Sequence, residues 1–103
     1  AGRRLRACDP GWPDDAPVLL TEFGGIAYVT NTDSEAWGYS NAVDAAGYEA
    51  HLSALVTAVR TSAPLAGFCY TQLTDTRQEA NGLCDENRQP KLPVETLRQI
   101  FAG

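Results

Sequence analysis

The sequence contains no methionine among its 103 residues. Because translation starts at methionine, the chain is either processed or a piece of a longer protein, and we favour the second interpretation. It also lacks an apolar run of the roughly 18 residues that cross a bilayer, and it has no signal-peptide pattern at its start. These absences predict no membrane-spanning segment and leave the cellular compartment open.

Positive charge is scarce as well. The chain has 8 lysines and arginines against 13 aspartates and glutamates, for a net charge of −5, with no long basic run. Nucleic acid and anionic membranes are therefore not expected as partners. The 3 cysteines, Cys8, Cys69 and Cys84, have no CxxC or histidine–cysteine spacing. Neither a disulfide framework nor a zinc site is expected, and no other cofactor is predicted.

The remaining composition is ordinary for a small globular domain, with 44% hydrophobic and 20% charged residues. Residues 1–16 hold prolines, glycines and mixed charges, which indicates a loop or the remnant of a preceding segment. Residues 17–103 are predicted to form the folded part. Its expected elements are a strand at 18–22, a helix within 47–64, a strand at 65–73 and a helix at 93–101.

This order of strand, helix, strand and helix predicts an α/β fold in which the two strands pair in parallel. Parallel sheets are covered on both faces, whereas two helices can cover only one face here. Either another chain or, as we favour, the rest of a larger α/β domain would cover the other face. By itself the chain is expected to self-associate through its uncovered face and strand edges.

Ligands of parallel α/β folds bind at the carboxyl ends of the strands. Glu22 lies at that end of the first strand, where the apolar run "VLL" gives way to an acid and two glycines. Gln72 and Asp75 lie at or just past the same end of the second strand. These residues are polar candidates for a binding site, together with Thr74 and with Asn31, Asp33 and Asn41 of the connection between the strand and the helix.

The connection 24–46 is long for a segment without regular structure, which favours a binding loop. Its aromatic residues Tyr28, Trp37 and Tyr39 could stack on the apolar face of a sugar ring. The alternative is that these rings pack as lids over the core and that Glu22 is a solvated or capping carboxylate. The acidic segment 74–87 lacks a calcium-loop pattern and is expected to be a solvated loop.

Two long segments resemble the C-terminal part of the catalytic domain of glycoside hydrolase family 2. They read "PVLLTEFGGIAY" followed by "WGYS", and "LAGFCYTQLTDTRQEANGL" with "ENRQPKLP". The resemblance runs from about Pro17 to Phe101 and implies a (β/α)₈ TIM barrel, of which this chain would be about the last two βα units. It implies that Glu22 is the catalytic nucleophile of a retaining glycosidase, with a carbohydrate as substrate.

The family's acid/base glutamate follows an asparagine, and no Asn-Glu dipeptide occurs in this sequence. The resemblance therefore implies that the chain carries the nucleophile without the acid/base and is inactive in isolation. Many members have a tryptophan in the eighth strand, where this chain has Tyr70, Thr71 and Gln72, so the sugar stays undetermined. Tyr70 joins the expected substrate-binding residues. The alternatives are a non-catalytic carbohydrate-binding or assembly module and an independent α/β domain.

Overall fold

The computed structural model describes residues 11–13, 15–30, 40–42 and 44–103. The expectation for most of residues 1–16 lies outside this part. The elements are β1 (Val18–Gly24), β2 (Ile26–Ala27), β3 (Ser40–Asn41), α1 (Ala45–Arg60), β4 (Leu65–Thr71) and α2 (Val94–Ala102). Over the described part of the chain, no helix is both long and apolar enough to cross a membrane.

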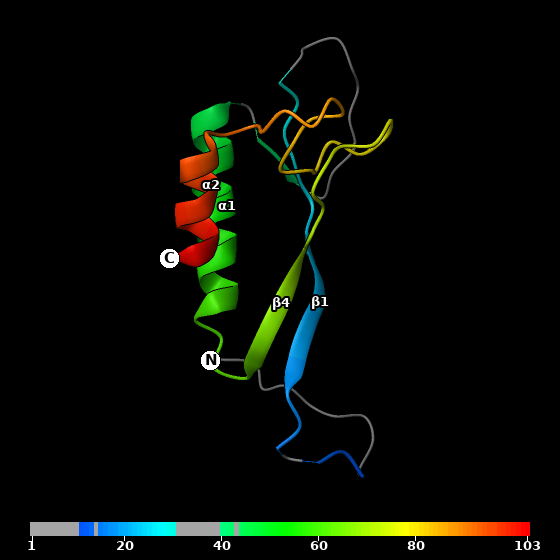
Figure 1. The fold of residues 1–103 in the computed structure, drawn as a ribbon, viewed down its shortest axis with the longest axis vertical. Helices are drawn as coiled ribbons and strands as arrows, with labels where there is room; N and C mark the ends of the chain where they lie inside the picture. Colours follow the sequence, from blue (N-terminus) through cyan, green and yellow to red (C-terminus); the bar gives the residue numbers. More distant parts are fainter. Residues whose placement is uncertain (1–10, 14, 31–39, 43) are drawn as a thin grey trace.

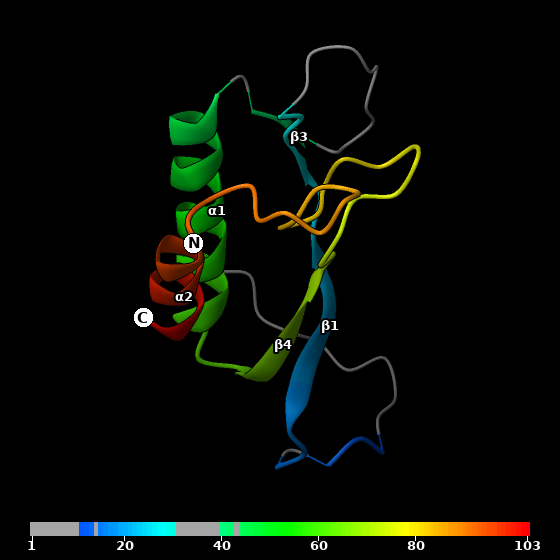
Figure 2. The same cartoon turned by 45° about the horizontal axis from the view of Figure 1, so that its top comes forward.

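The two long strands pair in parallel, as the order of elements predicts. The register joins Val18 to Leu65 at one end and Gly24 to Thr71 at the other. Both helices lie on the same side of this two-stranded sheet (Figure 1). The loop that follows β4 extends beyond the carboxyl ends of both strands (Figure 2). The α/β class with a parallel sheet and flanking helices is therefore confirmed.

The core lies between the sheet and α1. Tyr48, Leu52 and Val56 recur every fourth residue of α1, so they share one face, and all three are fully buried. Ile26 and Leu92 complete the buried cluster, and the apolar face of α2 packs against it. The opposite sheet face has no such cover among the described residues.

Local interactions set the limits of α1. The Asp44 carboxylate caps the helix by accepting a hydrogen bond from the amide of Gly47 at 2.7 Å. The helix ends at Arg60, four residues before the proline that we expected to close it. Arg60 donates through Nη2 to the carbonyl oxygen of Ala102 at 3.1 Å, which ties the end of α1 to the end of α2.

The connection after β1 is not wholly irregular, contrary to our expectation. Ile26 and Ala27 form β2 and pair in parallel with Ser40 and Asn41 of β3. The amide of Tyr28 then donates to the carbonyl of Ala80 at 3.0 Å. This last hydrogen bond attaches the start of the connection to the loop that follows β4.

Candidate functional site

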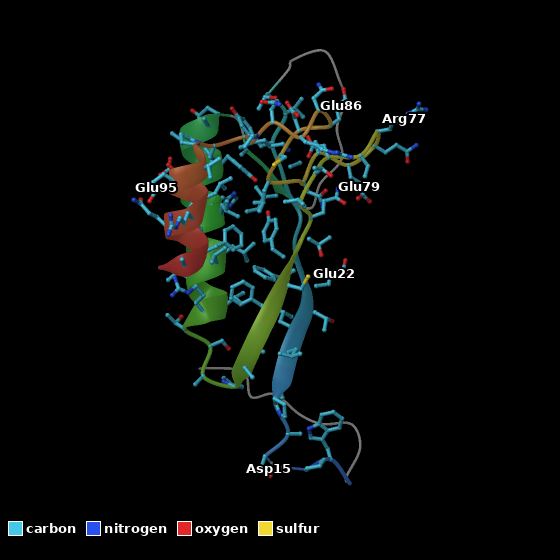
Figure 3. All side chains as sticks on the ribbon, in the orientation of Figure 1. Asp15, Glu22, Arg77, Glu79, Glu86 and Glu95 are labelled. Carbon is cyan, nitrogen blue, oxygen red and sulfur yellow. The ribbon has the colours of Figure 1, made fainter. Side chains whose placement is uncertain are left out.

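Glu22 lies two residues before the end of β1 and is exposed. Its side chain projects from the side of the sheet away from the helices (Figure 3). The next residue, Phe23, packs edge-to-face against Phe68 and Tyr70 and belongs to the rim of the core. The adjacent side chains of Glu22 and Phe23 therefore lie on opposite faces of the sheet. Phe23 faces the core and Glu22 faces the open side.

A bulge in β1 shifts the alternation of side chains just before Phe23. Leu20 pairs with Phe68 and Phe23 pairs with Tyr70. Between these two pairs β1 has two residues and β4 has one. The extra residue falls in the Thr21–Glu22 segment. Bulges break the strict alternation of side chains and re-aim them, which is why they often occur beside active sites.

Two glycines follow and let β1 end close to β4. Gly24 has a φ of +138° and Gly25 a φ of +82°, conformations that side chains with a Cβ rarely adopt. A Cβ on Gly24 would also collide with the carbonyl oxygen of Thr71. Only glycine at this position lets the backbone pass so near the end of β4.

A cavity of about 330 Å³ lies at this junction. That volume is at the lower end of the range of about 300–1,000 Å³ found for small-molecule sites. Its lining consists of Glu22, Phe23, Gly24, Gly25, Thr71 and Asn81. The cavity thus joins a carboxylate at the end of one parallel strand to an amide from the loop after the other.

Asn81 is a residue that the sequence analysis missed. It is only 5% exposed, and its Oδ1 accepts a hydrogen bond from Nε2 of Gln72 at 2.8 Å. Gln72 also donates to Oε2 of Glu79 at 3.4 Å. The predicted residue Gln72 therefore does not line the Glu22 cavity itself, but it is hydrogen-bonded to Asn81, which does.

Asp75 is held in an ion pair. Its Oδ1 lies 2.7 Å from Nζ of Lys91, whose side chain is fully buried. Burial lowers the pKa of Lys91, and the neighbouring Asp75 carboxylate opposes that shift. The segment 74–87 was expected to be a solvated loop. That expectation is wrong for its centre, because residues 80–82 are buried.

Of the predicted aromatic residues, Tyr28 and Tyr70 do not line the Glu22 cavity, and the other two lie outside the described part of the chain. Tyr28 stacks on Tyr48, with ring centroids 5.0 Å apart and planes at 20°. Tyr70 packs against Phe101 of α2, with centroids 5.5 Å apart, so its ring faces the helices. Trp37 and Tyr39 lie outside the described residues.

The Tyr70 hydroxyl is buried and has no hydrogen bond of normal geometry to any described residue, although it lies near the Tyr48 hydroxyl. Burial raises the pKa of Tyr70 to about 12. Burial, and then the nearby Tyr70 hydroxyl, raise the pKa of Tyr48 well above its usual value. Both phenols therefore stay neutral at physiological pH.

Within the described residues, no group of three or more histidine, cysteine, aspartate or glutamate side chains is arranged to hold a metal ion. The chemistry that the site offers is that of an exposed carboxylate beside a small, partly polar cavity. Comparison with protein-family models and with curated proteins found no match for the chain.

Proposed function

We propose that the chain contributes the nucleophile of a retaining glycoside hydrolase and forms about the last two βα units of its (β/α)₈ barrel. The observation that carries the proposal is the setting of Glu22. Its carboxylate is exposed near the carboxyl end of a parallel strand, on the side away from the helices, beside a cavity. Barrel enzymes carry their catalytic groups at this end of their strands.

The uncovered sheet face supports the barrel part of the proposal. Leu19 of β1 is 59% exposed, although apolar side chains of parallel strands are normally buried. In a closed barrel this face would line the interior and six further strands would pair with the free edges. A chain separated from those strands would tend to self-associate through the same face.

The proposed reaction has two displacements. An oxygen of Glu22 attacks the anomeric carbon, the bond to the leaving oxygen breaks, and a carboxylic acid outside this chain protonates that oxygen. Water then attacks the same carbon, the outside carboxylate takes its proton, and the carboxylate of Glu22 is released. The product keeps the anomeric configuration of the substrate.

Within this proposal, Gln72 supports the cavity through Asn81. Tyr28, Tyr70 and Asp75 act as structural residues, because each is engaged with other side chains of the protein. This leaves Glu22 as the described residue with a direct chemical role.

Chemical rescue tests the proposal in the longer protein that carries this chain. The Glu22→Ala variant should lose activity on an aryl glycoside by about 10⁴-fold or more. Azide should then restore turnover and give a glycosyl azide of inverted configuration, because it attacks from the side that the carboxylate has vacated. Glu86→Ala, which removes an exposed glutamate from the same chain, is the control. Full activity of Glu22→Ala would refute the proposal.

A further inference from the structure

The Asp75–Lys91 ion pair is a buried charged pair that the proposed reaction does not use. The Lys91 side chain is fully buried and that of Asp75 is 13% exposed. Buried ion pairs often add little stability, because removing both charges from water costs about as much as their attraction returns. The contacts of this pair indicate a role beyond stability.

Those contacts fall on both neighbours of Asn81. Nζ of Lys91 donates to the carbonyl oxygen of Ala80 at 2.7 Å. Oδ1 of Asp75 accepts the hydrogen bond of the Gly82 amide at 2.8 Å, and the same oxygen accepts from Lys91. The backbone before and after Asn81 is thus fixed by two side chains that are bonded to each other.

The side chain of Asn81 is oriented by a separate contact. Its Oδ1 is used by Gln72, and in the described part of the chain its Nδ2 makes no hydrogen bond. Asn81 also lines the cavity beside Glu22. The Asn81 amide therefore has its acceptor atom bonded within the protein, while the same residue contributes to the wall of the cavity.

We infer that Asp75 and Lys91 are positioning residues of the Glu22 site, which hold the Ala80–Gly82 backbone so that Asn81 forms the cavity wall. Neither residue is among those that line the cavity. The effect of the pair on turnover rests on the proposed function, whereas its effect on the position of Asn81 does not. Displacing a positioned group by about 1 Å can cost on the order of 10²-fold in rate.

Two variants separate positioning from stability. Lys91→Met leaves a buried, unpaired carboxylate and should destabilise the chain. Asp75→Asn combined with Lys91→Met removes both charges and keeps an acceptor for the Gly82 amide, so it should regain most of the lost stability. Ala80 keeps its hydrogen bond from Tyr28 in both variants. If the pair is a positioning device, the double variant does not regain the native position of Asn81.

Two measurements are needed, one of the structure of the chain and one of the activity of the longer protein. Nuclear magnetic resonance of the chain should show shifted Asn81 side-chain amide signals in both variants. In the longer protein, kcat/KM should fall by about 10–100-fold in both, at a temperature where both remain folded. The control is Asp44→Ala, which removes the acceptor of the Gly47 amide at the start of α1. Asp44→Ala should destabilise the chain without moving Asn81, because it leaves the Asp75–Lys91 pair in place.

The inference is overturned if the double variant regains native Asn81 signals together with its stability, or if Asp44→Ala shifts those signals equally. The resonance measurement decides the inference even if Glu22→Ala proves fully active, because it needs no turnover. Loss of activity in Glu22→Ala with unchanged Asn81 signals in both ion-pair variants would refute this inference and leave the proposed function standing.

Discussion

At the scale of single residues, Glu22 and Phe23 are adjacent in sequence and face opposite environments. Phe23 packs with Phe68 and Tyr70, and Glu22 faces the open side of the sheet. The sequence predicts Glu22 as a candidate, because an acid at the end of an apolar run is visible without coordinates. It does not predict the bulge, since the register of β1 against β4 depends on long-range pairing.

The backbone that follows Glu22 should be intolerant of any side chain at Gly24. Gly24→Ala combines a φ of +138° with a collision against the Thr71 carbonyl, so we expect a loss of about 3 kcal/mol or failure to fold. Gly67→Ala is the control, because its Cβ would meet only the end of the exposed Leu19 side chain at 3.0 Å. Urea unfolding should show a large loss for the first variant alone. Equal losses would contradict this account of β1.

The unpaired hydroxyl of Tyr70 leads to a different expectation. Tyr70→Phe removes a buried polar atom that has no hydrogen bond, so the free energy of unfolding should stay level or rise slightly. Tyr48→Phe removes the hydrogen bond from that hydroxyl to the Gly82 carbonyl, 3.2 Å away, and should cost about 1 kcal/mol. Thermal unfolding of both variants distinguishes the two phenols. A marked loss in Tyr70→Phe would show that its hydroxyl has a stabilising partner.

At the scale of elements, the sequence predicts the type and order of the helices and strands well. It predicts the residues at which they begin and end less well. The apolar period of α1 and the apolar runs of β1 and β4 are strong signals, and the structure contains all three. The helix ends early because the amides of Ser62 and Leu65 form turn hydrogen bonds to Val59 and Ser62. β2 and β3 have two residues each, too few to show a period.

The N-terminus of α1 should depend on its cap. Asp44→Ala removes the only side-chain acceptor that α1 has for the Gly47 amide in the described part of the chain, and we expect a loss of about 1 kcal/mol. Asp44→Asn keeps an acceptor oxygen and should cost only a few tenths of that. Urea unfolding of the two variants side by side is the measurement. Equal stability of Asp44→Ala and the natural chain would contradict the capping role.

At the scale of the whole molecule, only part of the candidate site can be predicted from the sequence. Glu22 and Gln72 are predicted from their places after the strands, whereas Asn81 and Lys91 sit in a loop without any period. These residues meet only because the loop folds back over the strand ends (Figure 2). The direction of the Tyr70 ring is also not predicted by the sequence, because it follows from the register of β4 against β1.

The stability of the molecule should fall at alkaline pH. Tyr48 and Tyr70 have pKa values above their usual 10.0 in the folded chain, so their contribution is full below pH 10 and is lost as the pH rises toward 12. The pKa of Lys91 is lowered in the folded chain, so its contribution to stability increases as the pH rises. That contribution stops changing above the unfolded pKa of 10.5. The tyrosines therefore dominate between pH 10.5 and 12.

Urea unfolding at pH 8, 10.5 and 12, chosen around those pKa values, measures this effect. We expect the largest loss in the last interval and a smaller loss there in Tyr70→Phe. A pH dependence that is the same in Tyr70→Phe and the natural chain would mean that this phenol ionises as easily when folded as when unfolded.

The central claim is that Glu22 is a glycosidic nucleophile, and trapping its covalent intermediate tests it most directly. The longer protein would be inactivated with a 2-deoxy-2-fluoro glycoside bearing a good leaving group, then digested and analysed by mass spectrometry. The claim predicts one added fluoroglycosyl group on the peptide "VLLTEFGG", with fragmentation placing it on Glu22. A label on any other residue would contradict the claim.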